Sequence, residues 1–149
     1  MQEDKKLSRE EAISFYTEDI LKLDKYLRWL NENSGTNASS IYKKDGLSDS
    51  SMAFPVYDAT LLSFIKTVKT TKFINPNYVY TYSTHRIKTA EDELDMIERC
   101  TLQDIGVLGD ILSKYVLKGE VKGTVWSEGL KSGVYLSIVK QLKIVAGIK

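Results

Sequence analysis

Apolar residues recur every three or four positions near the start of the chain, and this spacing restricts the fold to helical classes. Within LSREEAISFYTEDILKLDKYLRWLNENSG the apolar positions are Ile13, Tyr16, Ile20, Leu23, Leu27 and Leu30. Such spacing puts them on one face of a helix, and Ser8 with Glu11 forms a capping box at its start. We expect one helix from Ser8 to Gly35. The stripe covers fewer than four heptads, which favours a packed bundle helix over a coiled coil.

Similar patterns predict helices in four further segments: residues 54–73, 89–100, 101–119 and 126–146. Two of these begin with capping boxes, formed by Thr89 with Asp92 and by Thr101 with Asp104. Gly119 is well suited to end the third. With no internal repeat and a length that fits one domain, the sequence predicts a mainly α protein. We expect residues 1–149 to form a compact single-domain helical bundle of about five helices.

Residues 34–53 interrupt this pattern. Their sequence, SGTNASSIYKKDGLSDSSMA, is rich in Ser, Gly, Asn and Asp and predicts a long loop or irregular excursion. A small hairpin around KKDG is the alternative. Loops of this length are uncommon within compact domains and are usually functional or mobile.

Composition excludes several classes of protein. The 149 residues are 42% apolar and 28% charged, with one cysteine and one histidine. A single cysteine cannot form a disulfide within the chain, and these residues offer no metal-ligand spacing, so we expect no metal and no cofactor. The polar start lacks the apolar segment of a secretory signal. Since no apolar run of about 18 residues occurs, we expect a cytoplasmic protein without a membrane partner.

Charge is unevenly distributed along the chain, although the net charge is only +1. Residues 59–90, the basic block, carry five basic side chains and no acid. Residues 91–110, the acidic block, carry seven acids against Arg99. Such blocks can mark an interaction surface. Alternatively, they face one another within the fold or are simply solvated.

The segment YVYTYSTHRIK, residues 78–88, combines three alternate tyrosines with the chain's histidine. As a strand, it would present the tyrosines on one face. As a short helix opened by the preceding Asn-Pro pair, it would place Tyr78 and Tyr82 one turn apart and direct Tyr80 elsewhere. We favour the helix because no partner strand is evident. We then expect Tyr78 and Tyr82 to enter the core and the outer side to bind.

Seven residues form the candidate binding set: Lys66, Lys69, Lys72, Tyr80, His85, Arg86 and Lys88. The cations could hold an anion, and the tyrosine could stack on a base or contact a protein partner. A strong nucleic-acid binder usually has a pI above about 9, whereas this chain has a pI near 7.7. We therefore favour a protein partner or self-association, including a homodimer, over a nucleic-acid-associated regulator using residues 66–88.

A nucleophilic catalytic site would require Cys100 or a serine beside His85 and an acid. Free cysteine is among the most buried residue types, and the sequence does not bring Cys100 to His85. Glu91 and Asp95, four residues apart, are more typical of a solvated helix start. We assign no catalytic residue, and an enzyme built around His85 is the least favoured of the three hypotheses.

Two glycines fall inside the expected last helix. Gly129 and Gly133 are four residues apart, and each costs a helix about 1 kcal/mol relative to alanine. Close approach of another helix would account for both, and an irregular helix start is the alternative for Gly129.

The last third of the chain resembles a family of small uncharacterised bacterial and phage proteins that share a domain of unknown function. The resemblance extends over about residues 50–145 and includes the FPVYDATLLSFI and YVYTYSTHRIKT segments. It implies a mainly helical fold without an assigned activity. Where that family has an Arg-Phe-Cys-like run, this chain has EVKGT, so no chemistry carries over there. The matching positions are Tyr115, Gly119, Glu120, Gly123, Trp126, Gly133 and Leu142.

Overall fold

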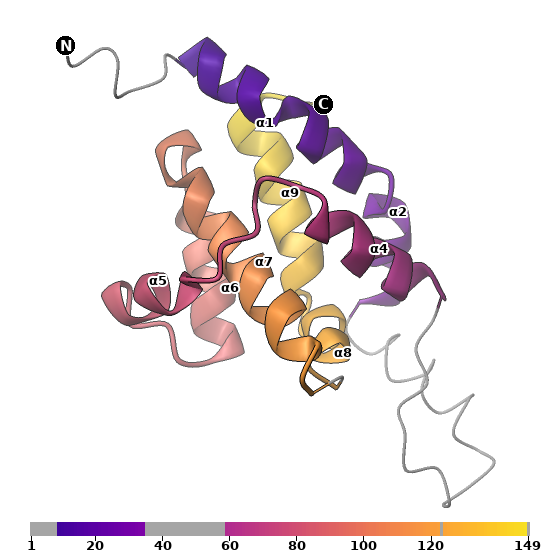
Figure 1. Ribbon diagram of the computed structural model, residues 1–149. Coiled ribbons are helices and arrows are strands. Elements are labelled where there is room, and N and C mark those ends of the chain that lie inside the picture. The colour runs from indigo at the N-terminus through magenta and orange to yellow at the C-terminus, as the bar shows by residue number, and fades with distance from the viewer. Residues whose placement is uncertain (1–8, 35–58, 123, 149) are drawn as a thin grey trace, which may run out of the picture.

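The computed structural model describes residues 9–34, 59–122 and 124–148, and in these ranges the protein is helical without a strand (Figure 1). The mainly α class predicted from the sequence is therefore confirmed. The expected excursion at residues 35–53 lies outside the described ranges. The elements are α1 (Arg9–Asp24), α2 (Leu27–Asn33), α4 (Ala59–Lys69), α5 (Tyr78–Thr84), α6 (Ala90–Arg99), the 3-10 helix η2 (Leu102–Asp104), α7 (Ile105–Gly119), α8 (Thr124–Lys131) and α9 (Val134–Ala146).

The count of about five helices was wrong, because the described residues form eight α-helices. One reason is that the expected helix at residues 8–35 is divided after Asp24 into α1 and α2. At the break, Tyr26 is buried, and its hydroxyl shares hydrogen bonds with Ser63 (2.6 Å) and Thr67 (3.0 Å) of α4. The apolar stripe survives the break, since Ile20, Leu23 and Leu30 are all fully buried.

The expected helix at residues 126–146 is also two helices, α8 and α9. Gly133 lies between them with φ of 84° and ψ of 7°, a left-handed conformation that glycine adopts at little cost. It is therefore a helix break and not an interior glycine. Gly129 does allow a close approach, because a Cβ there would lie 2.3 Å from Cζ of Tyr135.

Two of the three capping boxes expected from the sequence are present, and the cap expected at Ser8 lies outside the described residues. The expected start of the tyrosine helix at the Asn75-Pro76 pair was wrong, since α5 begins at Tyr78 after Asn77. Thr89 and Asp92 form a full capping box at the start of α6, and Thr101 and Asp104 form one at η2. Gly119 ends α7 as expected. These are local interactions between residues three apart, which is why sequence reading locates them.

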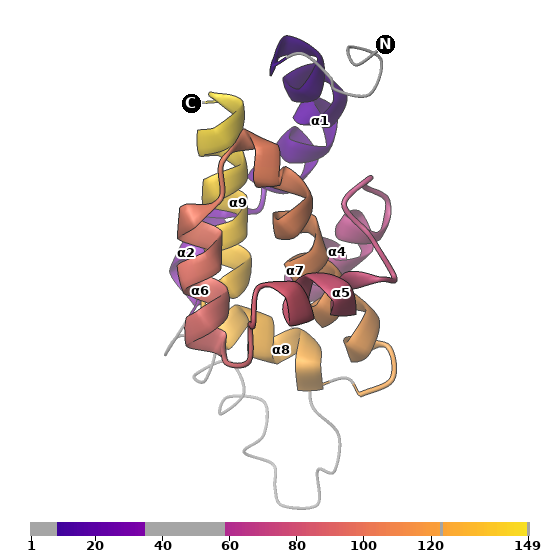
Figure 2. The ribbon, with the colours of Figure 1, turned by 90° about the vertical axis from the view of Figure 1, so that its left-hand side faces the viewer.

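Helices α7 and α9 form the centre of the bundle. α9 contacts α1, α2, α6, α7 and α8, while α7 also contacts α4, α5 and α6. Figures 1 and 2 show α7 and α9 running side by side with the shorter helices around them. α5 and α6 lie on the same side of the molecule, in front of this central pair in Figure 2. The central contact buries, among others, Leu108, Ile111 and Leu112 of α7 and Ile138, Val139 and Leu142 of α9.

Candidate functional site

The tyrosine segment forms the short helix α5, as favoured from the sequence. The chain enters it through Asn77, whose backbone N–H donates to Oδ1 of Asn75 (2.9 Å). Tyr82 packs against the core but none of the seven α5 residues is fully buried. The expectation that Tyr78 also enters the core was wrong: it lies at the edge, with its ring centre 6.2 Å from that of Tyr82. Apolar burial alone therefore does little to hold α5 in place.

A buried carboxylate on α6 provides the first anchor for α5. Glu93 is 1% exposed, and its Oε2 accepts hydrogen bonds from the Tyr82 hydroxyl (2.6 Å) and from Nζ of Lys114 (2.9 Å). Its Oε1 accepts a short hydrogen bond from the Tyr115 hydroxyl. Burying a carboxylate is costly unless it is paired and hydrogen-bonded. These donors meet that need, and they connect α5, α6 and α7.

The two tyrosines of this cluster resist ionisation. Burial raises the pKa of Tyr82, and the negative charge of Glu93 raises it further. Burial also raises the pKa of Tyr115, and its hydrogen bond to Glu93 adds to the effect. Both hydroxyls therefore keep their protons at neutral pH and act as donors to the carboxylate.

A second carboxylate, on α7, holds the middle of α5 and the turn before it. Asp110 is 9% exposed and accepts hydrogen bonds from Nδ2 of Asn75 (2.9 Å) and from the Thr81 hydroxyl. One turn further along α7, the fully buried Ser113 accepts from the backbone N–H of Asn75 (2.8 Å). α5 and the turn before it are thus fixed to α7 by polar contacts.

The opposite side of α5 faces solvent. Tyr80 is 73% exposed and Val79 is 58% exposed, so Tyr80 points away from the core as the helical prediction required. His85 and Arg86 follow at the end of the helix and are exposed. Arg86 has φ of 56°, and this left-handed turn precedes the buried Ile87. We call the exposed set Val79, Tyr80, His85, Arg86 and Lys88 the α5 surface.

The other three lysines of the candidate set, Lys66, Lys69 and Lys72, lie elsewhere. Lys66 and Lys69 are on α4, which packs against α1 and α7 and lies on a different side of α7 from α5 (Figure 1). Lys66 is exposed, whereas Lys69 forms an ion pair with Glu120. The seven candidate residues therefore fall into two separate groups, and residues 66–88 do not form one continuous surface.

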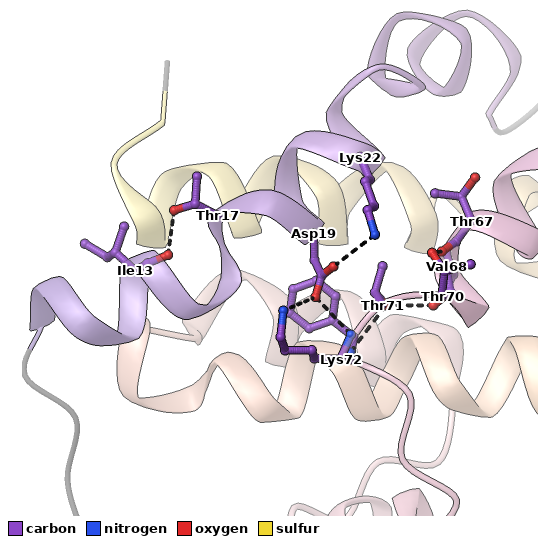
Figure 3. A network of polar contacts seen from close by, with 10 residues as sticks. Ile13, Thr17, Asp19, Lys22, Thr67, Val68, Thr70, Thr71 and Lys72 are labelled. Carbon is purple, nitrogen blue, oxygen red and sulfur yellow. Dashed lines mark hydrogen bonds and ion pairs between the residues drawn. The ribbon is translucent and has the colours of Figure 1, made fainter.

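Lys72 belongs to a network that attaches α1 to the end of α4 (Figure 3). Its backbone N–H (2.9 Å) and its Nζ (3.4 Å) both reach Oδ2 of Asp19, which is 2% exposed. Nζ of Lys22 lies 3.7 Å from the other oxygen of this carboxylate. The Lys72 ammonium also lies 5.0 Å from the centre of the Phe15 ring. These contacts give Lys72 a structural role within the fold.

The exposed side of α6 carries three acids and one base, Arg99. Glu91, Asp95 and Glu98 are all exposed and follow one another at helical spacing. The ion pairs of the basic block join Lys69 to Glu120 and Lys72 to Asp19, and Glu93 of the acidic block pairs with Lys114. Within the described residues, no ion pair joins the basic block to the acidic block. The two blocks are nevertheless in contact: hydrogen bonds from the backbone N–H groups of Lys88 and Thr89, together with the Lys88 charge, lower the pKa of Asp92.

Cys100 and His85 are poorly placed to form a nucleophilic pair. Cys100 is 3% exposed at the C-terminal end of α6, and burial raises the pKa of its thiol to about 11. His85 is exposed before the start of α6. The ten residues of that helix span about 15 Å. A protonated, buried thiol is a poor nucleophile, so this geometry does not favour cysteine chemistry at neutral pH.

Neither a metal-ligand cluster nor a helix able to span a membrane occurs in the described residues. No group of three or more His, Cys, Asp or Glu side chains there could hold a metal ion. None of the helices described is both long enough and apolar enough to cross a membrane.

Sequence reasoning missed the two buried carboxylates that hold α5. Glu93 was grouped with the other acids of α6, but Met96, Ile97 and Cys100 lie three, four and seven residues further on. That spacing places Glu93 on the apolar face of the helix, so the signal was present. For Asp110 the sequence gives no such signal. Buried residues lie on both sides of it along α7, and its partner Asn75 is 35 residues away.

Comparison with known proteins does not extend this description, since no protein-family model, curated protein or solved structure matches the chain.

Proposed function

We propose that this protein is a non-enzymatic protein-interaction module that binds its partner through the α5 surface. One observation carries the proposal: Tyr80 and Val79 are 73% and 58% exposed on a helix whose other side is fixed by Glu93 and Asp110. The resemblance to small bacterial and phage proteins supports placing the module in a bacterium or one of its mobile elements.

The fixed backbone of α5 matters for binding. A side chain on a rigid element loses less conformational entropy on association than one on a free loop. Tyrosine combines a large apolar ring with a hydroxyl and is enriched at the centres of protein interfaces. Tyr80 therefore has the properties of an interface anchor, with Arg86 and Lys88 as charged neighbours.

A capture experiment tests this proposal. Wild type, Tyr80→Ser and Ile144→Ser would be immobilised and exposed to a nuclease-treated lysate of the source organism. Ile144 is the matched control because it is a similarly exposed apolar residue (67%) on a different helix, α9. We expect one or more proteins to be retained by wild type and by Ile144→Ser but lost with Tyr80→Ser. Equal retention by all three, with equal thermal stability, would contradict an interaction through α5.

Binding of nucleic acid is the second candidate, supported by the exposure of Tyr80, His85, Arg86 and Lys88 within one short segment. The adjacent acids Glu91, Asp95 and Glu98 of α6 argue against it, since they would repel phosphates. A polyanion column separates the candidates. Retention with a steep salt dependence would favour nucleic acid, and flow-through at low salt would remove this alternative.

A further inference from the structure

The charged surface next to α5 has an unusual arrangement. The basic block ends at Ala90 and the acidic block begins at Glu91, so the change of sign coincides with the start of α6. Arg86 and Lys88 are exposed on the basic side of this boundary, and Asp95 and Glu98 are exposed on the acidic side. Lys88 also acts on Asp92, whose carboxylate accepts from the Lys88 backbone N–H. Because no ion pair within the described residues joins Arg86 or Lys88 to Asp95 or Glu98, these side chains remain available to a partner.

A surface that carries both halves of a complementary pair suits a twofold-symmetric dimer. In such an interface both subunits use the same surface. If one residue of the first subunit contacts a second residue of its partner, the same two residues also meet with the subunits exchanged. The basic end of α5 in one copy can then oppose the acidic side of α6 in the other, twice per dimer. Figure 2 shows α5 and α6 on the same side of the molecule, as this geometry requires.

The exposed apolar residues of α5 supply the centre of such an interface. Val79 and Tyr80 are one to two turns before Arg86 on the same short segment, so apolar contact would lie beside the charged contacts. Interfaces commonly have this arrangement, with an apolar centre and a polar rim.

We propose that the occupant of the α5 surface is α6 of a second copy of this chain, in a twofold-symmetric homodimer. This proposal rests on the proposed function, because it identifies the partner of the same surface. It predicts self-association that weakens in salt, since screening shortens the range of charge interactions from about 10 Å at 0.1 M to about 3 Å at 1 M.

Two charge-reversed variants, measured separately and then mixed, test the proposal. The first variant is Arg86→Asp with Lys88→Glu; aspartate is tolerated at the left-handed position of Arg86. The second variant is Asp95→Lys with Glu98→Lys, both on the exposed side of α6. In a dimer of either variant alone, like charges oppose one another. In a mixed dimer, every charge contact is complementary again.

Sedimentation velocity over a wide concentration range would measure these species. We expect wild type to dimerise, each variant alone to dissociate at least about tenfold more readily, and an equimolar mixture to regain the wild-type sedimentation coefficient. The matched control is Lys66→Glu, which reverses an exposed charge on α4 and should leave the dimer unchanged. Recovery in the mixture also shows that both variants are folded.

Two results would overturn the dimer. One is a wild-type protein that stays monomeric at low salt and high concentration. The other is a failure of the charge-reversal test. This failure is either a dimer that both variants form as readily as wild type, or an equimolar mixture of the variants that does not regain the wild-type sedimentation coefficient. Either result would leave the capture experiment with Tyr80→Ser as a separate test of whether α5 binds a different protein. Equal capture by wild type and Tyr80→Ser would instead reject the α5 surface itself.

Discussion

The hydroxyl of Tyr82 donates a hydrogen bond of 2.6 Å to Oε2 of Glu93, a carboxylate that is 1% exposed. This contact joins α5 to α6 across eleven residues of sequence. Since α5 contains no fully buried residue, its position depends strongly on such polar contacts. The outward direction of Tyr80 follows from the inward direction of Tyr82, so the interaction surface depends on a buried acid.

Removing the Tyr82 hydroxyl should loosen α5. Tyr82→Phe keeps the ring but takes away one donor to Glu93, and a hydrogen bond to a charged group contributes about 1.5–3 kcal/mol. We expect the free energy of unfolding in urea to fall by that amount. Tyr80→Phe removes an exposed hydroxyl and should change it by less than about 0.5 kcal/mol. Faster amide exchange within α5 of Tyr82→Phe would locate the effect, and equal stability of the two variants would contradict it.

Glu93 should be the most sensitive acid of α6. Glu93→Ala leaves the Tyr82 and Tyr115 hydroxyls and the Lys114 ammonium without their acceptor. Breaking a buried ion pair by removing one partner costs about 3–5 kcal/mol. We expect urea denaturation to show a loss in this range.

The control for that experiment is Glu98→Ala, on the exposed side of the same helix. Its expected effect is within about 0.5 kcal/mol of wild type. If Glu93→Ala were as stable as Glu98→Ala, the buried carboxylate would contribute nothing to holding α5, α6 and α7 together.

Two glycines of α7 should respond in opposite directions to alanine. A Cβ at Gly109 would lie 2.7 Å from the backbone oxygen of Phe73, and backbone cannot move aside cheaply. We expect Gly109→Ala to lower the free energy of unfolding by about 1–3 kcal/mol. A Cβ at Gly106 meets nothing within 4 Å, so Gly106→Ala should raise it by up to about 1 kcal/mol. Thermal denaturation of both variants measures the difference, and a stabilising Gly109→Ala would show that Phe73 is not packed here.

Cys100 should make the protein less stable in alkali. Burial raises the pKa of its thiol from 9.0 to about 11, so between these values the unfolded thiol has lost its proton while the folded one keeps it. Unfolding then releases a proton, and the free energy of unfolding falls as pH rises. The stabilisation is complete below pH 9 and is lost as the pH approaches 11.

Cys100→Ala is the comparison for this pH dependence. It is expected to be less stable than wild type at neutral pH, because a buried side chain is shortened. The fall in stability between pH 9 and pH 11 should be smaller for this variant than for wild type when both are measured by urea denaturation. Parallel curves would show that the thiol does not contribute. Titration of Tyr82 and Tyr115, whose pKa values are also raised, affects both proteins equally above pH 10.

Part of the candidate site could be read from the sequence. The direction of Tyr80 followed from the helical spacing of Tyr78 and Tyr82, and the structure has Tyr80 exposed as expected. The lysines could not be assigned this way. Lys69 and Lys72 have partners 51 and 53 residues away, Glu120 and Asp19, and no local pattern identifies an ion pair at such a separation.

The sequence by itself determined the helical class, the capping boxes at Thr89 and Thr101 and the end of α7 at Gly119, because these depend on residues within one or two turns of each other. Tertiary structure decided where the first long helix breaks, since Tyr26 bonds to Ser63 and Thr67 of α4. It also decided that Glu93 and Asp110 are buried acceptors, with partners up to 35 residues away. The physical reason is range: backbone hydrogen bonds and caps act within a few residues, whereas a buried charge is stabilised by whichever donors the packed helices bring to it.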